Sequence, residues 1–441
     1  MSDERKRAER RVGWARLWAR AKQIVTTDPS GSDDDDHLPD EEAARVLAAQ
    51  AGRLKGGLAK VAQLAAYDPG ASFGSRSGAT QASRQVLGGL WDHAPAVSTG
   101  AITKVIEEDL GQAPQALFGH WDPSPLASAS IGQVHAASLH DGTDVVVKVQ
   151  YPGVADALRA DLDDAAFVRK LAGSEIGRSL DAESLRALGD AVRGELDYRA
   201  EAAAQQRFAA AWADHKMLRF PRVIEELSTG RVLTMTRARG KSIVEVAASG
   251  SLDLRRQAAL AIYQFVWASP ILHRLVNADP NPGNFLVEEQ PDGHALVWCL
   301  DFGCSLELPE EVRAADRELW WSLLDDDLAS AAERFRMGLA KAGLLLRADM
   351  LATNAHRDWE RVLAAPLATH GDFHWSADYA RDLAEATGRV LAAGGVALHA
   401  RVLLMWRQRL GAAAVIGMLD AKAPFRRGLL ELIGSGKRAL R

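Results

Sequence analysis

Two short polar motifs in the C-terminal half constrain the fold of this chain more than any other feature. The first contains Asp279 and, five positions later, Asn284; the second is an Asp-Phe-Gly triplet that begins at Asp301, 22 residues after Asp279. Between them, residues 285–300 form two apolar runs around Pro-Asp-Gly, a pattern that predicts a β-hairpin. Each motif alone is weak, but the two together, joined by a hairpin, are specific.

The residues of these motifs have the chemistry that phosphoryl transfer needs. A carboxylate must orient or deprotonate the acceptor, and oxygen ligands must hold one or two Mg²⁺ ions that neutralise the phosphates. The same parts occur in the same order in protein kinases. We therefore predict that Asp279 is the catalytic carboxylate and that Asn284 and Asp301 are Mg²⁺ ligands. The alternative is that both aspartates only cap or turn their loops.

A lysine on a predicted strand supplies the next part of such a site. Apolar runs at 131–138 and 144–149 flank a His-Asp-Gly-Thr segment, which predicts a second hairpin. Lys148 follows three valines in the second run, and a kinase needs a strand lysine to hold the nucleotide phosphates. We predict this role for Lys148; a plain edge charge is the alternative.

Such a lysine requires an acidic partner on a nearby helix. Three candidates, Glu195, Asp197 and Glu201, lie in one stretch that we predict to be helical. Asp197 and Glu201 are four residues apart and would share a helix face. Spacing alone does not choose the partner, and a solvated acidic face is the alternative.

The segment at the place of the kinase Gly-rich loop has an unusual composition. Residues 125–134 contain alanines and serines and only one glycine. Because Cβ atoms restrict how closely a backbone can approach phosphates, nucleotide handling should differ from that of a protein kinase. The predicted nucleotide contacts in this loop are Ala127, Ser128, Ala129 and Ser130. We expect the adenine to meet the segment between the lobes, 234–238 with Met235, through backbone hydrogen bonds.

Shifts in composition and periodicity predict four segments. Residues 1–45 are a basic segment followed by an acidic linker, and residues 46–115 are a helical extension. Residues 116–238 form a β-containing lobe, and residues 239–441 form a mostly helical lobe with an embedded hairpin. The predicted fold class is therefore α+β.

Composition excludes several classes of protein. A net charge of −5 argues against a uniformly basic nucleic-acid binder, and two cysteines cannot form a disulfide framework. Because no run of ~18 uninterrupted apolar residues occurs, we expect a cytoplasmic protein without a transmembrane helix. Residues 1–22 are basic and carry Trp14 and Trp18 at helical spacing. Such a helix either lies on an anionic membrane surface or packs on the protein body.

Taken together, these residues resemble the UbiB-like (AarF-like) atypical kinases, a family named for ubiquinone biosynthesis. That family has an Ala-rich loop in place of the Gly-rich one, and residues 127–130 are similar to it, with Ser128 substituted. Its hallmark is a Lys-x-Gly-Gln motif on an N-terminal helical extension, which Lys60 to Gln63 resembles with Ala62 in place of glycine. The other matching motifs are those around Lys148, Glu195-x-Asp197 and Asp279 to Asn284. The resemblance covers roughly residues 50 to 330.

The resemblance implies a bilobal protein-kinase-like fold, with an N-terminal helical extension laid over the site where a protein substrate would bind. The implied site residues are Lys60 and Gln63 lining the active site, Glu195 or Asp197 in contact with Lys60, and Glu201 as the partner of Lys148. The implied cofactors are ATP or ADP with Mg²⁺. The implied activity is that of an ATPase or small-molecule kinase that supports isoprenoid-quinone or other lipid metabolism. The implied partners are nucleotide, a peripheral anionic membrane surface or lipid, and proteins of a biosynthetic complex.

The chain departs from the family pattern at four positions. Asn277 and Asn281 stand where the family usually has histidine, and Ala62 and Ser128 alter the two signature motifs. Both aspartates, the lysine and the Mg²⁺-binding asparagine remain, so we expect catalytic competence.

Two other functions fit parts of the pattern. Small-molecule phosphotransferases of the aminoglycoside or choline kinase kind share the Asp-x-x-x-x-Asn loop and a downstream Asp, but the Lys60–Gln63 extension and the Ala-rich loop favour the UbiB-like family. The other is a nucleotide-binding pseudokinase that acts as a scaffold. The intact Asp279, Asn284 and Asp301 count against that role.

Overall fold

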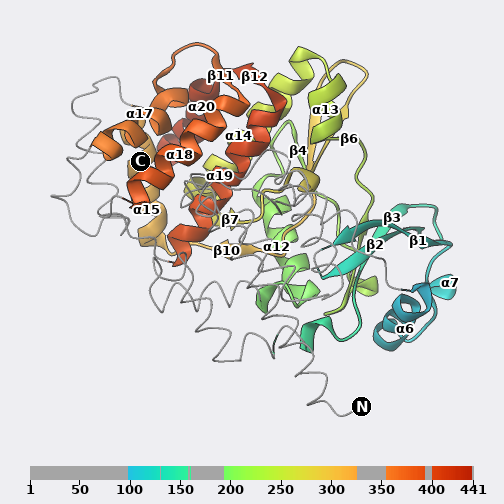
Figure 1. Ribbon diagram of the computed structural model, residues 1–441. Coiled ribbons are helices and arrows are strands. Elements are labelled where there is room, and N and C mark those ends of the chain that lie inside the picture. The colour runs from blue at the N-terminus through green and yellow to red at the C-terminus, as the bar shows by residue number, and fades with distance from the viewer. Residues whose placement is uncertain are drawn as a thin grey trace, which may run out of the picture. The chain divides into compact units, whose positions relative to one another are not determined.

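The computed structural model describes residues 98–129, 131–156, 159, 193–324, 354–392 and 400–439. The chain divides into two compact units, residues 1–164 and 165–441. The described part of the first unit contains three paired strands and short helices, whereas helices dominate the second (Figure 1). The α+β class is therefore confirmed, while the four predicted segment boundaries stay predictions.

The described part of the N-terminal unit holds an antiparallel meander of β1 (His120–Ala129), β2 (Gly132–Ser138) and β3 (Asp144–Gln150). Residues 139–143 connect β2 and β3, and two of them favour the turn. The Asp141 carboxylate accepts a hydrogen bond from the Thr143 backbone N–H at 2.9 Å, and Gly142 has a φ of 87°. A left-handed φ favours glycine, so Asp-Gly is suited to this position. The hairpin predicted here is confirmed.

The pleat of β3 sorts its side chains between two faces of the sheet. The fully buried face carries Val145, Val147 and Val149. Helix α6 (Thr99–Leu110) contacts this strand. Its buried residues, at helical spacing, are Ile102, Val105 and Ile106. Because side chains alternate along a strand, Lys148 lies on the face opposite these valines.

In the C-terminal unit, short strands hold the two polar motifs side by side. The predicted hairpin in residues 285–300 forms as β8 (Phe285–Glu289) and β9 (Ala295–Cys299), with Gly293 at a φ of 80°. Strands β4 (Leu218–Arg219) and β6 (Lys241–Ser242) extend it to the order β4-β9-β8-β6. Strand β7 (Leu275–Asn277) pairs antiparallel with β10 (Ser305–Glu307). The first motif follows β7 and the second precedes β10, so this pairing brings both to one place.

The sequence of residues 223–235 predicts two short strands around Ser-Thr-Gly, and the prediction of the first strand is wrong. Val223 makes only an isolated bridge to Met235, and a 3-10 turn (Glu225–Leu227) follows. The second strand forms as β5 (Val232–Thr236). The Ser228 hydroxyl donates to the Ile224 carbonyl at 2.8 Å, which satisfies the backbone locally and favours the turn over an extended strand.

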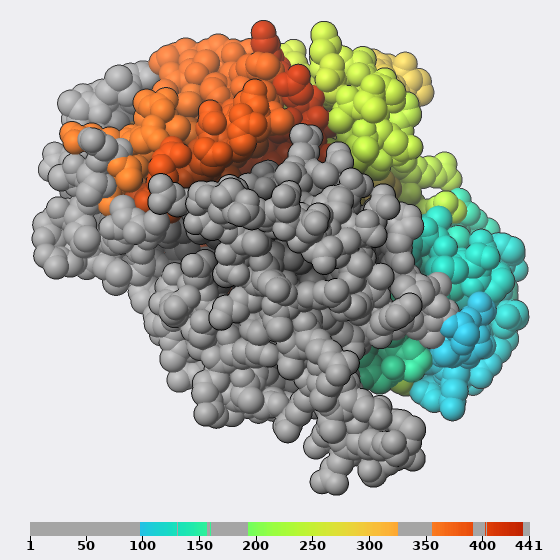
Figure 2. All heavy atoms as spheres, in the orientation of Figure 1, coloured from blue at the N-terminus to red at the C-terminus, as the bar shows by residue number. Residues whose placement is uncertain are grey.

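Helix α14 (Leu252–His273) is the central element of the helical part. It contacts α13 (Ile243–Ser249), α15 (Glu310–Leu323), α19 (Ala400–Leu419) and α20 (Phe425–Ala439). Helices α17 (Asn354–Ala368) and α18 (Ala377–Ala392) pack on one another and on α20 or α19, and β11 (Phe373–Trp375) pairs with β12 (Ala421–Ala423). In the space-filling view the C-terminal helices form one continuous surface, coloured orange and red (Figure 2).

Aromatic side chains fill the core around α14. Tyr263 and Trp267 stack with their ring centroids 4.6 Å apart, and Trp375 and Phe425 meet Tyr263 edge-on. Such edge-to-face pairs add to the free energy gained by burying the rings. None of the described helices has the length and apolar character needed to cross a bilayer.

Candidate active site

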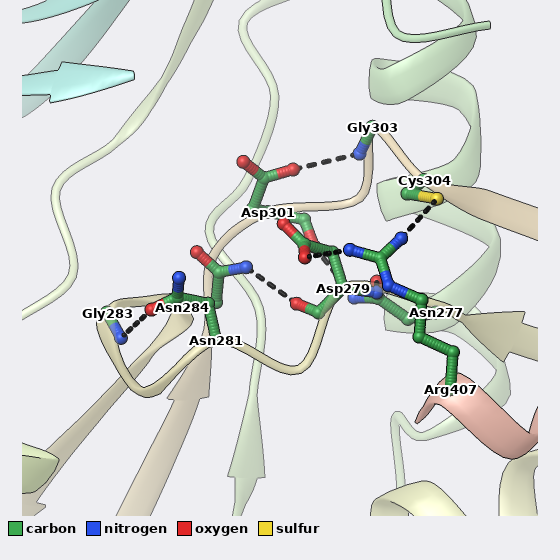
Figure 3. A network of polar contacts seen from close by, with 9 residues as sticks. All are labelled: Asn277, Asp279, Asn281, Gly283, Asn284, Asp301, Gly303, Cys304 and Arg407. Carbon is green, nitrogen blue, oxygen red and sulfur yellow. Dashed lines mark hydrogen bonds and ion pairs between the residues drawn. The ribbon is translucent and has the colours of Figure 1, made fainter. Parts of the chain in front are cut away.

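The loop after β7 is held together by its own backbone and amide groups (Figure 3). The Asp279 carbonyl accepts two hydrogen bonds, from Asn284 Nδ2 at 2.7 Å and from the Asn281 backbone N–H at 2.9 Å. Because the Asn284 amide nitrogen donates inward, its Oδ1 is turned away from the Asp279 backbone. This is the orientation in which an asparagine can offer its oxygen to a metal ion.

Asn277 ties this loop to the Asp-Phe-Gly segment. Its Nδ2 donates to the Asp301 carbonyl at 2.7 Å, and its Oδ1 accepts from the Asp279 backbone N–H at 3.3 Å. The Leu300 N–H donates to the Asn284 carbonyl at 3.0 Å and gives a second link between the loop and the segment before Asp301. A side-chain amide has a donor nitrogen and an acceptor oxygen, so Asn277 can bond to both motifs at the same time. The asparagine at this position therefore keeps the two motifs in register, although the family pattern has histidine there.

The Asp-Phe-Gly segment is anchored by its phenylalanine. Phe302 is 1% exposed, and its ring lies 5.0 Å from that of Phe208 and 5.8 Å from that of Phe220. Asp301 Oδ1 accepts a hydrogen bond from the Gly303 N–H at 2.9 Å. The Asp301 carboxylate is thus fixed by local geometry beside Asn284 and Asp279.

Helix α12 (Tyr198–Ala211) carries a single buried face toward this segment. The residues of that face, spaced three and four apart, are Tyr198, Glu201, Gln205 and Phe208. A Cβ placed on Gly303 would lie 3.3 Å from Asp301 Oδ1, 3.4 Å from Glu201 Oε2 and 3.5 Å from Glu195 Cγ. The two glutamates and Asp301 therefore meet around Gly303. Glycine at this position leaves the carboxylates room.

The prediction that Asp197 shares a helix face with Glu201 is wrong. Asp197 has extended backbone (φ −126°, ψ 102°) and is the N-cap of α12, where its carboxylate accepts from the Arg199 N–H at 3.0 Å. An aspartate immediately before a helix stabilises that helix, because its carboxylate accepts a hydrogen bond from one of the first backbone N–H groups, which have no partner within the helix. Asp197 is exposed, whereas Glu195 and Glu201 are 6% and 2% exposed.

In the N-terminal unit, the strand register places Lys148 in line with the Ala-rich segment. Lys148 pairs with Val134, and Val134 pairs with Ala127. Ala129 is two residues further along β1, on the same face. Ser128 pairs with Gln133 and so faces the other way. The segment predicted as a loop is thus mostly strand, with Lys148, Ala127 and Ala129 on one face.

Three predicted site residues lie outside the described residues: Lys60, Gln63 and Ser130. Lys148 and Glu201 belong to different compact units, and their pairing stays a prediction. Met235 is 5% exposed on β5, and its sulfur lies 3.8 Å from Gln205 Nε2 of α12. Its predicted contact with adenine also stays a prediction.

Sequence reasoning missed one residue of this site, Arg407 on α19. Its Nη2 donates to Asp279 Oδ1 at 3.0 Å, and its Nη1 lies 3.9 Å from the Cys304 sulfur. The two charged side chains are 7% and 10% exposed. A signal for it exists in the sequence, because Arg-Gln-Arg at 407–409 interrupts the otherwise apolar run of residues 402–419. Buried polar groups of this kind need partners.

The oxygen donors fit a magnesium ion. Mg²⁺ is usually held by one or two carboxylates together with substrate phosphates and water. Asn284 Oδ1 and the Asp301 carboxylate are such donors, on two loops that Asn277 holds together.

Comparison with known proteins gives matches over most of the chain. Residues 89–335 match a family model described as the ABC1 atypical kinase-like domain. Atypical kinase COQ8B, mitochondrial, of Rattus norvegicus is 32% identical over 274 residues, which are 62% of this chain and 51% of that protein. Uncharacterized protein Rv0647c of Mycobacterium tuberculosis is 33% identical over 336 residues, 74% of this chain and 64% of that protein. The chain therefore spans between half and two thirds of the length of these two relatives.

A solved structure resembles the chain over nearly its whole length. It is described as the complex of Rv3197 with erythromycin from Mycobacterium tuberculosis. The TM-score is 0.60 and the sequence identity 26%, and the match covers 89% of this chain and 96% of the solved one.

Proposed function

The chain belongs to the ABC1 atypical kinase-like family, as its resemblance to UbiB-like kinases predicted, and we propose that it is an ATP- and Mg²⁺-dependent phosphotransferase or ATPase. One observation carries the proposal. Hydrogen bonds to the side chains of Asn284 and Asn277 hold the backbone of Asp279, and link it to that of Asp301, so that the Asp279 carboxylate lies near two oxygen donors suited to Mg²⁺. This is the set that phosphoryl transfer requires.

Each residue has a distinct role in the proposed reaction. Mg²⁺ held by Asn284 and Asp301 would neutralise charge on the phosphates. Asp279 accepts the hydrogen bond, and then the proton, of the acceptor hydroxyl or water. A bond forms between that oxygen and the γ-phosphorus, and the bond from the γ-phosphorus to the bridging oxygen breaks, with its electron pair leaving on ADP. The resemblance implies two further roles, phosphate binding for Lys148 and, for Glu201, partner of the lysine ammonium group; both stay predictions.

The acceptor is a separate question, with three candidates. The chain is similar to a protein named atypical kinase COQ8B, mitochondrial, and the resemblance to UbiB-like kinases suggests an isoprenoid-quinone or other lipid at a peripheral membrane surface. The solved structure described with erythromycin makes that molecule a second candidate ligand. Water is the acceptor if the protein is an ATPase.

Nucleotide-dependent stability and ATP hydrolysis, measured on the purified full chain, test the proposal. We expect Mg–ATP to raise the melting temperature and to be hydrolysed slowly. Asp279→Asn should keep the thermal shift and lose the hydrolysis, because it removes the carboxylate and retains the shape. Anionic liposomes, and separately erythromycin, are added to identify the acceptor or activator. Stabilisation without turnover would favour the scaffold function, and no response to any nucleotide would refute nucleotide binding.

A further inference from the structure

The carboxylate at the centre of the site is held from a distant helix. Asp279 Oδ1 accepts from Arg407 Nη2 at 3.0 Å, in a place where both side chains are buried. Residues 280–283, Pro-Asn-Pro-Gly, bring no cation of their own to the loop. No described residue donates to Oδ2 of Asp279. One carboxylate oxygen is therefore engaged, and the other is left to meet an acceptor.

Helix α19 is itself fixed tightly enough to serve as a support. Gly411 sits against Pro280, and a Cβ on that glycine would lie 2.6 Å from the proline Cγ. Gln408 Nε2 donates to the Val266 carbonyl at 3.2 Å. Pro270, four residues after Val266 within α14, has no N–H to give that carbonyl. The glutamine therefore replaces a missing helical hydrogen bond and pins α19 to α14.

A second ion pair secures α19 next to Arg407. Arg409 forms two hydrogen bonds to the Asp316 carboxylate, at 2.8 and 2.6 Å, and both side chains are at most 1% exposed. A paired guanidinium and carboxylate of this kind define an orientation as well as a distance. Arg407 thus projects from a helix that the next two residues, Gln408 and Arg409, hold against α14 and α15.

We propose that Arg407 is a positioning residue of the active site, which fixes the Asp279 carboxylate so that its Oδ2 faces the phosphoryl acceptor. The proposal rests on the phosphotransferase or ATPase function proposed above. A planar guanidinium can restrict the rotation of a carboxylate, whereas a lysine ammonium is a point charge without that fork. Orientation of reacting groups is a major part of the rate of phosphoryl transfer. The catalytic loop is therefore completed by α19, about 130 residues later in the chain.

The test compares Arg407→Lys and Arg407→Gln with the wild-type full chain. A misplacement of ~1 Å can lower a rate by about 100-fold. We expect kcat for ATP hydrolysis to fall by roughly 10-fold in Arg407→Lys and by about 100-fold in Arg407→Gln. The KM for ATP should stay within about 2-fold, because Arg407 acts on the carboxylate and not on the nucleotide.

Two further variants separate positioning from a structural role. Arg426→Lys is the matched control, since it changes an equally buried arginine, on α20, that donates to the Leu367 and Leu324 carbonyls and does not contact Asp279; its kcat per folded molecule should stay within about 2-fold of wild type. In an Asp279→Asn background, Arg407→Gln should change the residual rate by less than about 2-fold, because the group that it positions is already gone. The wild type, Arg407→Gln, Asp279→Asn and the double variant also give the coupling between Arg407 and Asp279 in thermal unfolding. That measurement requires no activity.

The outcomes are distinct. A loss of kcat that disappears in the Asp279→Asn background, with an unchanged KM, supports the proposal. An unchanged kcat, or an equal loss in that background or in Arg426→Lys, overturns it. A wild-type protein that binds nucleotide without turnover overturns the proposed function. In that case, thermal unfolding decides whether the ion pair holds the loop. If the effects of Arg407→Gln and Asp279→Asn on the melting temperature are not additive, the ion pair holds it; if they are additive, that role is overturned.

Discussion

Substitution of Gly411 by alanine tests the contact between α19 and the catalytic loop. The new Cβ would lie 2.6 Å from Pro280 Cγ, whereas carbon atoms at rest are ~3.5–4.0 Å apart. An overlap of about 1 Å must be relieved by moving a rigid ring, because proline has no flexible end to swing aside. Pro280 directly follows Asp279, so the displacement reaches the carboxylate.

The magnitude is the sum of two opposing effects. Alanine in place of glycine within a helix stabilises by about 1 kcal/mol. Overpacking destabilises by about 1–3 kcal/mol. Gly434, on α20, has no described atom within 4 Å of its Cβ position, and Gly434→Ala therefore shows the first effect alone. We expect the two variants to differ by about 1–3 kcal/mol in the free energy of unfolding.

Urea unfolding and ATP hydrolysis provide the measurements. The rate for Gly411→Ala should fall by about 10- to 100-fold, while Gly434→Ala keeps the wild-type rate. Gly428→Ala gives an intermediate case, since its Cβ would also lie 2.6 Å from a neighbour, but from Cδ1 of the flexible Leu260. If Gly411→Ala is as stable and as active as Gly434→Ala, α19 does not bear on the catalytic loop and the reasoning is refuted.

Three other predictions concern the metal, acid stability and the buried ion pair. Asp301→Asn should weaken Mg²⁺-dependent nucleotide binding by at least about 10-fold, since loss of even an outer hydrogen-bond partner of a metal site has an effect of that size; an unchanged affinity in calorimetry would exclude a metal role. Burial lowers the pKa of His135 from 6.5, so the unfolded chain takes up the proton first and stability falls as the pH drops below 6.5. His135→Gln should flatten the slope of the urea midpoint against pH, and an identical slope would contradict this. Arg409→Met should destabilise by about 3–5 kcal/mol, because Asp316 is left buried without its cation, and adding Asp316→Leu should recover most of the loss; no recovery in thermal melts would show that the pair itself is stabilising.

Local chemistry explains which parts of the fold could be predicted. The two hairpins form where Asp-Gly separates apolar runs, because the left-handed conformation of Gly142 and Gly293 depends on the glycine itself. The strand at 223–224 fails for a related reason. The Ser228 hydroxyl, four residues after Ile224, satisfies the Ile224 carbonyl instead, and apolar periodicity does not record that competition.

At the site, helix α12, which carries Glu201, also shows that sequence periodicity does not record local side-chain hydrogen bonds. Periodicity indicated a helix through Asp197, but a capping carboxylate begins the helix one residue later and points elsewhere. Asn277 is the converse case. The sequence showed a departure from histidine, and only the hydrogen bonds at both ends of the amide show that the link between the motifs is kept.

Residue types at short, fixed spacings were enough to identify the family, the fold class and the residues whose chemistry suits phosphoryl transfer. How the site is held together depends instead on the packing of distant parts of the chain. Arg407 lies 128 residues from Asp279, and no local pattern relates two residues so far apart. Their contact depends on β7, α14 and α19 packing as they do, with Gly411 small enough to admit Pro280. A buried charge in an apolar helix signals that a partner exists, and only the packing of the chain identifies it.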